Sequence, residues 1–207
     1  WGIPHNCPTA DGKDIQNSSY RALRNGIRLN DIFGLVKKFK KKNPSKPIIL
    51  MGYYQMIFNY GEKKFIQKCK LSGVDGLIVV DLSFPDNKNF SKLCKKNSLC
   101  FIQLIAPTTT STRMKKIIKN SHEMIYMISS ISTTGSALKY SIKKIIKNYN
   151  VIKRIKPSKN IVIGFGITEK TISNLRSADG LVVGSAICRE ITRSLKDRQN
   201  PVTNVSN

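Results

Sequence analysis

The sequence is poor in acidic residues, with 12 Asp and Glu against 36 Lys and Arg, which gives a formal net charge of +24. An excess of this size raises the possibility of nucleic-acid binding. The lysines, however, are spread over nearly every segment with helical periodicity, beside the apolar positions, and no motif interleaves them with aromatic residues. We therefore favour a solvated basic surface over a nucleic-acid site, with a field that attracts phosphate anions.

Long apolar runs are also lacking. No stretch of 18 apolar residues occurs, so no membrane span is predicted. No basic segment followed by an apolar one comes after Trp1, so no signal peptide is recognised. The five cysteines form no CxxC pair, which favours reduced thiols in a cytoplasmic compartment.

Cys7 lies two residues from His5, a spacing that a Cys–His nucleophile or a metal pair could use. No further cluster of ligand residues lies nearby, so neither reading is favoured and no metal is predicted. His5 and His122 are expected to be solvent or turn residues rather than ligands.

What the sequence does contain is a series of short apolar runs, most of them continuous rather than alternating. This pattern is typical of strands that are buried on both faces, as in a parallel sheet. The runs cover residues 47–51, 76–81, 101–105, 124–128, 161–166 and 180–184.

Segments with helical periodicity separate these runs, as at residues 32–39 and 142–149. Six repeated βα units, preceded by a partial strand near Trp1, indicate an α/β protein with a parallel sheet. Neither GxGxxG nor a P-loop occurs, which favours a (β/α)8 TIM barrel over an open nucleotide-binding sheet. A barrel needs eight strands, so we expect this chain to have seven and to lack the first strand and helix.

The domain prediction follows from the absence of any linker or low-complexity segment. Residues 1–195 are expected to form one incomplete, phosphate-binding barrel domain, and residues 196–207 a polar tail with frayed ends. The missing strand would leave unpaired edges on the partial first strand and on the strand at 180–184.

The active site of a parallel barrel is built by loops at the carboxyl ends of its strands. Three such loops are rich in glycine, and they follow the last three strands: Gly135, then Gly164 and Gly166, then Gly184 with Ser185. Glycine lets backbone N–H groups approach an anion, and Gly184-Ser185 opens a helix whose N-terminus favours negative charge. We therefore predict a phosphate site, although the same glycines could serve only tight turns.

Acidic and aromatic candidates near those loops are ambiguous. Asp11 lies in a loop and Asp81 at a strand end, where each could act in chemistry or hold a neighbouring loop. Tyr126 lies within a strand, where a core role is its default. From the residues alone, the sequence indicates a phosphosugar-type barrel of unknown reaction.

The opening motif is more specific. Gly2-Ile3-Pro4, Pro8 through Gly12, and Ile15-Gln16 resemble the GIP…P-x-ADG-x-x-IQ signature of the tryptophan synthase alpha chain family. The resemblance extends to about residue 195. Further matching segments are 51–54, 73–76 with Asp81, 106–109, 134–136, 164–167 and 184–187.

This resemblance implies a carbon–carbon lyase of tryptophan biosynthesis, which cleaves indole-3-glycerol phosphate to indole and glyceraldehyde 3-phosphate by a retro-aldol reaction. It implies that Asp11 is the catalytic aspartate that accepts the indole N–H. It places the phosphate at Gly135, Gly164, Gly166, Gly184 and Ser185, and the substrate pocket at Tyr53, Tyr126, Thr134 and Phe165.

The resemblance also bears on partners. It implies no metal or organic cofactor for this subunit, and a pyridoxal phosphate-dependent tryptophan synthase beta subunit as the partner in an alpha2-beta2 heterotetramer. No nucleic acid and no membrane are implied.

Several positions depart from the family pattern. The family's catalytic glutamate lies directly before the position of Trp1 and is absent here, so this polypeptide is expected to be weakly active or inactive. Cys7 stands where the family has aspartate in the loop facing the beta subunit, and Ser132 replaces a glycine of the mobile loop. These departures leave coupling to a beta subunit open.

Three alternatives remain beside the lyase. One is a degenerate, non-catalytic partner of the beta subunit, and another is a phosphosugar isomerase barrel, against which the ADG and IQ motifs argue. The third is a basic nucleic-acid binder.

Overall fold

The computed structural model describes residues 1–129, 142–164, 167 and 172–206. Helices separate most of the strands along these ranges, and every strand pairing is parallel. The elements are α1 (Lys13–Arg24), α2 (Leu29–Lys42), β1 (Ile49–Gly52), α3 (Tyr54–Tyr60), α4 (Glu62–Ser72), β2 (Gly76–Val79), α5 (Lys88–Lys96), β3 (Cys100–Phe101), β4 (Gln103–Ile105), α6 (Ser111–Asn120), β5 (Met124–Ile128), α7 (Ile142–Ile155), β6 (Asn160–Gly164), η1 (Ser173–Leu175), β7 (Gly180–Val182), α9 (Ser185–Lys196) and α10 (Pro201–Ser206).

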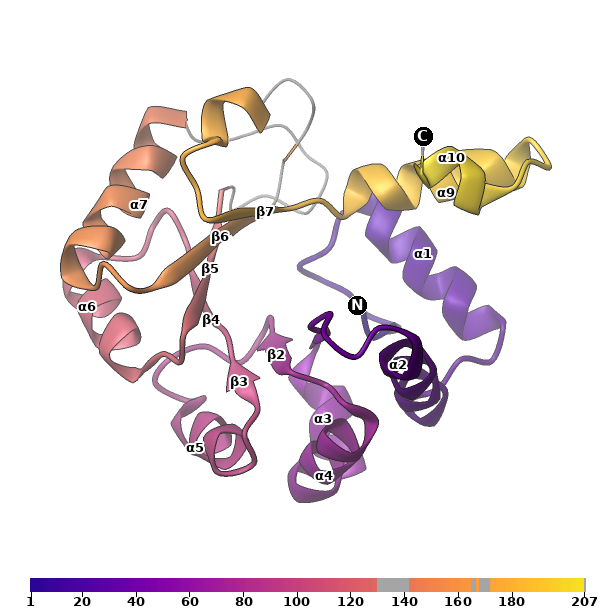
Figure 1. Ribbon diagram of the computed structural model, residues 1–207, viewed down its shortest axis with the longest axis horizontal. Helices are drawn as coiled ribbons and strands as arrows, with labels where there is room; N and C mark the ends of the chain where they lie inside the picture. The colour runs from indigo at the N-terminus through magenta and orange to yellow at the C-terminus, as the bar shows by residue number, and fades with distance from the viewer. Residues whose placement is uncertain (130–141, 165–166, 168–171, 207) are drawn as a thin grey trace.

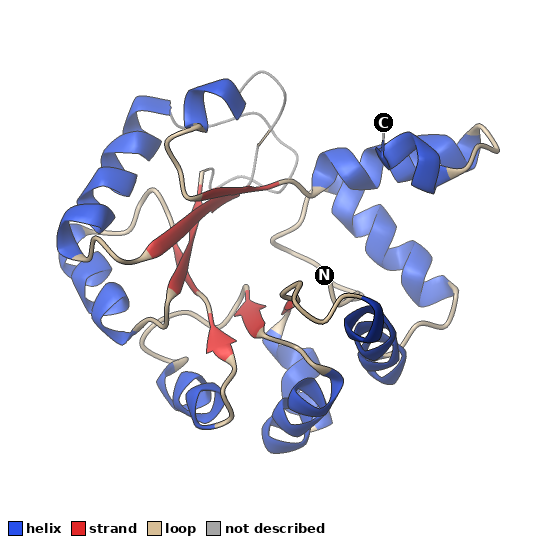
Figure 2. Ribbon diagram, in the orientation of Figure 1, coloured by secondary structure: helices blue, strands red, loops and turns tan. Residues whose placement is uncertain are grey.

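The strands form two sheets, in the orders β1-β2-β3 and β4-β5-β6-β7. One run of chain joins them, because β3 and β4 are separated only by Ile102, whose N–H donates to the Leu77 carbonyl at 2.9 Å. The first half of this run pairs with β2 and the second half with β5. Figure 2 shows the strands on the inside and most of the helices around them, as expected for a (β/α) barrel.

Two apolar clusters lie between the strands and their helices. The first joins β1–β3 to α2, α4 and α5, with Val36, Phe65 and Cys94 fully buried. The second joins β4–β6 to α6 and α7, with Ile125 and Ile152 fully buried. Val36 and Ile125 lie where the helical periodicity and the apolar runs predicted buried faces, whereas Leu35, which belongs to the same helical stripe as Val36, is 46% exposed.

A third cluster lies on the inner side of the strands. Ile78, Ile102 and Tyr126 are its buried members, and partly buried residues such as Met51 and Val182 pack against them. Its members come from β1 to β7, so side chains rather than open space fill the middle of the ring.

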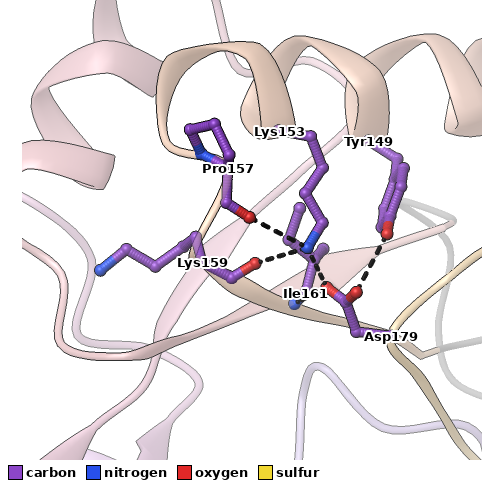
Figure 3. Close-up of polar contacts among 6 residues, drawn as sticks. All are labelled: Tyr149, Lys153, Pro157, Lys159, Ile161 and Asp179. Carbon is purple, nitrogen blue, oxygen red and sulfur yellow. Dashed lines mark hydrogen bonds and ion pairs between the residues drawn. The ribbon is translucent and has the colours of Figure 1, made fainter.

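A lysine–aspartate pair stabilises each half of the ring at the amino-terminal ends of the strands. Asp179, just before β7, accepts hydrogen bonds from the Ile161 N–H at 2.7 Å and from the Tyr149 hydroxyl at 3.2 Å, and pairs with Lys153 of α7 at 2.7 Å (Figure 3). The Lys153 ammonium also donates to the carbonyl oxygen of Lys159, at 2.9 Å.

The other half repeats this arrangement with different residues. Asp75, just before β2, accepts from the Ile48 N–H at 2.6 Å and pairs with Lys40 of α2 at 2.8 Å. In each half, an aspartate at the start of one strand thus contacts the start of the preceding strand. The same aspartate also pairs with the helix that leads into that preceding strand.

The ring is open on one side. Gly2 forms a parallel bridge with Met51, and β7 pairs with β6; within the described ranges, no strand joins β7 to the chain near Gly2. The predicted unpaired edges are therefore confirmed. Beside this opening, α1 and α9 lie side by side, with Arg189 paired to Asp14 at 2.8 Å and Arg21 donating to Thr192 at 3.2 Å (Figure 1).

The end of the chain differs from the expected frayed tail. Residues 201–206 form α10, which packs on α9, and Asn204 donates to the Ser194 hydroxyl at 3.0 Å. Its six residues are too few and too polar to show a helical period, so the sequence offered no signal for it. No helix in the described part of the chain is long and apolar enough to cross a membrane.

Candidate active site

The expected site residues that the structure describes lie at, or point toward, the carboxyl ends of the strands. Asp11 follows the bridge at Gly2, Tyr53 follows β1, Gly164 ends β6, and Gly184 with Ser185 follows β7. The predicted site residues outside the described ranges are Thr134, Gly135, Phe165 and Gly166.

Asp11 and Tyr53 form the polar centre of the site. The Tyr53 hydroxyl donates to Asp11 Oδ2 at 2.8 Å and accepts from the Ala10 N–H at 3.0 Å. Because the amide occupies an acceptor position of that hydroxyl, its proton points to the carboxylate. Gln16 of α1 holds the same loop, donating to the Asp11 carbonyl at 2.8 Å.

The protonation of this pair reflects its burial. Burial raises the pKa of the Asp11 carboxyl, while the hydrogen bond from Tyr53 opposes that rise. Burial also raises the pKa of Tyr53, and the hydrogen bond to Asp11 raises it further. Tyr53 therefore stays a neutral hydrogen-bond donor, and Asp11 is a partly desolvated carboxylate that can accept a proton or an N–H.

His5 was expected in solvent or a turn, and that prediction is wrong, because its side chain is buried against Tyr53. The two rings stack with centroids 4.8 Å apart and an interplanar angle of 26°. His5 Nδ1 accepts from the Cys7 N–H at 3.0 Å, so the ring proton lies on Nε2, which faces Gln55 Oε1 at 3.2 Å. The contact with Cys7 runs through its backbone and not its exposed thiol, so these bonds are not those of a Cys–His nucleophile.

Tyr126 links Asp11 to the glycine at the end of β6. Tyr126 is buried in the inner cluster; burial raises the pKa of its hydroxyl, and the nearby negative charge of Asp11 raises it further. A Cβ at Gly164 would overlap the Tyr126 hydroxyl, so glycine is needed there to admit the phenol. Asp11, Tyr126 and Gly164 therefore occupy one region, although 153 residues separate the first from the last.

Ser129, which the sequence did not single out, holds the same corner. Its hydroxyl and its N–H both donate to the Gly164 carbonyl, at 2.7 and 3.0 Å, and its side chain is fully buried. A lone serine after an apolar run carries no distinctive signal, so only the fold reveals this contact.

The N-terminus of α9 completes the described part of the site. Gly184 is the N-cap residue and Ser185 the first residue of this 12-residue helix. A Cβ on Gly184 would lie 3.6 Å from Ile15 of α1, the helix that directly follows the Asp11 loop. The packing of α1 on α9 thus brings the first and last strand ends to the same mouth.

Asp81 holds the chain that follows a neighbouring strand, which was one of the two roles predicted for it. Its Oδ1 accepts from the Tyr54 N–H at 2.7 Å, which satisfies a free amide at the start of α3. Among the described residues, no group of three or more His, Cys, Asp or Glu side chains is placed to hold a metal ion.

Comparison with known proteins agrees with this geometry. The family model for the tryptophan synthase alpha chain matches residues 1–207. The chain belongs to the tryptophan synthase alpha chain family. The resemblance seen in the opening motif is therefore confirmed.

Two curated relatives show how far this alpha chain similarity extends. The tryptophan synthase alpha chain of Pelagibacter ubique (strain HTCC1062) is 64% identical over 206 residues, which cover 100% of this chain and 78% of the relative. That of Thermococcus kodakarensis is 39% identical, over 97% of this chain and 78% of the relative.

Solved alpha chain structures share the fold. The subunit from Legionella pneumophila str. Paris matches with a TM-score of 0.87 and 30% identity, over 99% of this chain and 75% of that one. An alpha chain in the a2b2 tryptophan synthase complex of Pyrococcus furiosus matches with a TM-score of 0.84 and 36% identity, over 99% and 81%. The barrel-type arrangement predicted from the sequence is thus confirmed, with the ring open between β7 and Gly2.

Proposed function

We propose that this alpha chain acts as a carbon–carbon lyase that cleaves indole-3-glycerol phosphate into indole and glyceraldehyde 3-phosphate. The observation that carries the proposal is a partly buried carboxylate, Asp11, aimed by Tyr53 and located at the same strand ends as Gly164 and the N-terminus of α9. The names of its relatives support the assignment.

The reaction breaks the bond between indole C3 and the first glycerol carbon. C3 gains a proton, the hydroxyl on that carbon loses one and becomes the aldehyde, and the bonding electrons return to the indole ring. Protonation at C3 places positive charge on the ring nitrogen, which a carboxylate hydrogen-bonded to the N–H stabilises. Asp11 suits this role because burial and the Tyr53 hydrogen bond hold it in place as an acceptor.

The phosphate is proposed to bind at the other side of the mouth. Gly184 and Ser185 offer the free amides and positive dipole end of α9, and Gly164 brings backbone close to the same region. Gly135 and Gly166 are proposed as further phosphate contacts from their match to the family motifs. Tyr53, Tyr126, Thr134 and Phe165 are proposed to line the substrate pocket.

We further propose that the chain works with a pyridoxal phosphate-dependent beta subunit in an alpha2-beta2 assembly in the cytoplasm. The a2b2 complex of the Pyrococcus furiosus relative supports the partner, and five free thiols support the compartment. The second candidate function is a degenerate module that binds a beta subunit without cleaving substrate. The exposed Cys7 favours it, since it stands where the family has an aspartate facing that partner.

The test measures both binding and cleavage of indole-3-glycerol phosphate by the 207-residue chain. Calorimetry reports the affinity, and release of indole and glyceraldehyde 3-phosphate in equal amounts reports the reaction. Asp11→Asn is expected to lower kcat/KM by about 10²–10⁴-fold. The control is Asp86→Asn, which changes an exposed aspartate and is expected to leave kcat/KM within about twofold.

The outcomes separate the two functions. Capture of a beta subunit by a chain that does not bind indole-3-glycerol phosphate would support the degenerate module. A chain that binds no indole-3-glycerol phosphate, or whose Asp11→Asn variant matches the parent, would rule out the proposed role of the site.

A further inference from the structure

His5 joins three segments of the candidate site. Its backbone is held by Ser19 of α1, whose hydroxyl accepts from the His5 N–H at 2.7 Å and donates to the His5 carbonyl at 3.0 Å. Its ring contacts Tyr53, Gln55 and the Cys7 amide. The side chain thus has a fixed position, because both its backbone groups and its two ring nitrogens have partners.

These contacts act on the Asp11–Tyr53 pair from two sides. Stacking at 4.8 Å fixes the plane of the Tyr53 ring, whose hydroxyl donates to Asp11. The bond from the Cys7 N–H to Nδ1 fixes the start of the loop that ends at Asp11. Gln55, two residues after Tyr53, ties that loop to the first turn of α3 through its contact with His5 Nε2.

We propose that His5 is a positioning residue that holds Tyr53 and the 5–11 loop so that the Asp11 carboxylate meets the indole N–H. This inference rests on the proposed lyase function for its substrate, but the geometry of the pair belongs to the free protein. His5 acts through Tyr53 and Asp11 and is not itself placed on the reacting atoms.

A purely structural role would look different, and His122 supplies the comparison. His122 Nδ1 accepts from the Phe101 N–H at 2.9 Å, much as His5 Nδ1 accepts from the Cys7 N–H at 3.0 Å. His122, however, lies just before β5, at the opposite end of the strands from Asp11. Removal of the His122 side chain is expected to destabilise the fold without changing the titration of Asp11.

The first experiment follows the Asp11 carboxyl by carbon-13 NMR across a pH series, without any ligand. In the parent, the hydrogen bond from Tyr53 counters the rise that burial causes in the Asp11 pKa. In His5→Ala we expect the Asp11 titration to move to higher pH, since the Tyr53 ring loses its stacking partner and the hydrogen bond that opposes the rise weakens. His122→Asn should leave the titration where it is in the parent.

The second experiment measures how well the chain distinguishes indole-3-glycerol phosphate from its N1-methyl derivative, which cannot donate to Asp11. His5→Ala should reduce the ratio of the two affinities about fivefold, as expected for one misaligned hydrogen bond to a charged group. His5→Phe keeps a ring over Tyr53, and His5→Asn keeps an acceptor for the Cys7 N–H. In each of these variants the affinity ratio should therefore fall by less than in His5→Ala. In an Asp11→Asn background, His5→Ala should lower the affinity ratio no further.

The outcomes are distinguishable. If His5→Ala only lowers the melting temperature and leaves both the Asp11 titration and the affinity ratio unchanged, the positioning role is refuted. If the parent binds neither compound, the proposed function fails, and the ligand-free titration still decides whether His5 positions Asp11.

Discussion

At the scale of single residues, tight contacts between neighbouring groups determine which side chain can occupy a position. Gly164 admits the Tyr126 hydroxyl, and Ser129 holds the Gly164 carbonyl with two hydrogen bonds. Tyr53 is fixed by an amide, a carboxylate and the stacked ring of His5. Because packed interiors leave no spare volume, small additions at such points have large effects.

Gly164→Ala is expected to lower the free energy of unfolding by about 1–3 kcal/mol, since its methyl group would displace the Tyr126 ring. Gly34→Ala is the matched control. Gly34 lies in α2 with no atom within 4 Å of an added Cβ, so alanine there should stabilise the protein by about 0.5–1 kcal/mol. Urea unfolding of both variants measures the difference, and equal effects would contradict the packing argument.

At the scale of elements, the two lysine–aspartate pairs show how the chain satisfies backbone amides next to the starts of β1 and β6, at Ile48 and Ile161. Each aspartate serves a strand start and a lysine together, through partners 27 residues apart at Asp75 and 18 residues apart at Asp179. Partial burial raises the pKa of Asp179, but the hydrogen bonds from Lys153 and the Ile161 N–H outweigh it, so the net pKa is lowered. The charged form is therefore the one that stabilises the fold above about pH 4.

Asp179→Ala is expected to reduce the free energy of unfolding by about 1–3 kcal/mol, since the Ile161 amide loses its partner and Lys153 its counter-charge. Asp197→Ala, which removes an exposed carboxylate 4.0 Å from Arg193, should change it by less than about 0.5 kcal/mol. Thermal unfolding compares the two; similar losses would show that the Asp179 contacts contribute little.

The open edge gives a prediction for strand dynamics. β5 is paired on both sides, by β4 and β6, whereas β7 is paired by β6 alone and its residues are only half-buried. Native-state hydrogen exchange should therefore be at least about tenfold faster at the amides of β7 than at those of β5. Equal protection of Leu181 and Ile125 would contradict an unpaired edge at β7.

At the scale of the whole molecule, parallel strands are held in a ring by helices outside and side chains inside, and α1 and α9 flank the opening (Figure 1). The excess of 24 positive charges is spread over this surface. In such a protein, buried histidines matter for acid stability because protonation adds one more positive charge inside the fold.

Burial lowers the pKa of His122 below its usual value of 6.5, and the charges of Lys95 and Lys159 lower it further. A lowered folded-state pKa means that the neutral ring stabilises the fold fully above about pH 6.5, and that this contribution is lost as the pH falls through the lowered pKa. The free energy of unfolding should therefore decline on acidification through this range, and less steeply in His122→Asn. Identical pH dependence in both proteins would exclude His122 as the cause.

Much of the fold could be predicted from the chain because buried strands and amphipathic helices leave local patterns. The run at 124–128 is β5 to the residue, and the positive φ of Gly73 ends α4 as glycine commonly does. The break that divides the run at 101–105 between β3 and β4 left no such pattern, since it falls at Ile102, an apolar residue with no turn signal beside it.

The sequence by itself determined the order of parallel βα units, the family, and the placing of Asp11, Gly164 and Gly184 at strand ends, because periodicity and motif spacing are properties of neighbouring residues. Only the tertiary structure decided that His5 is buried on Tyr53, that Tyr126 occupies the space beside Gly164, and that α1 lies against α9. These contacts join residues 38 to 175 positions apart, and their hydrogen bonds and stacking exist only once the strands have paired and the helices have packed.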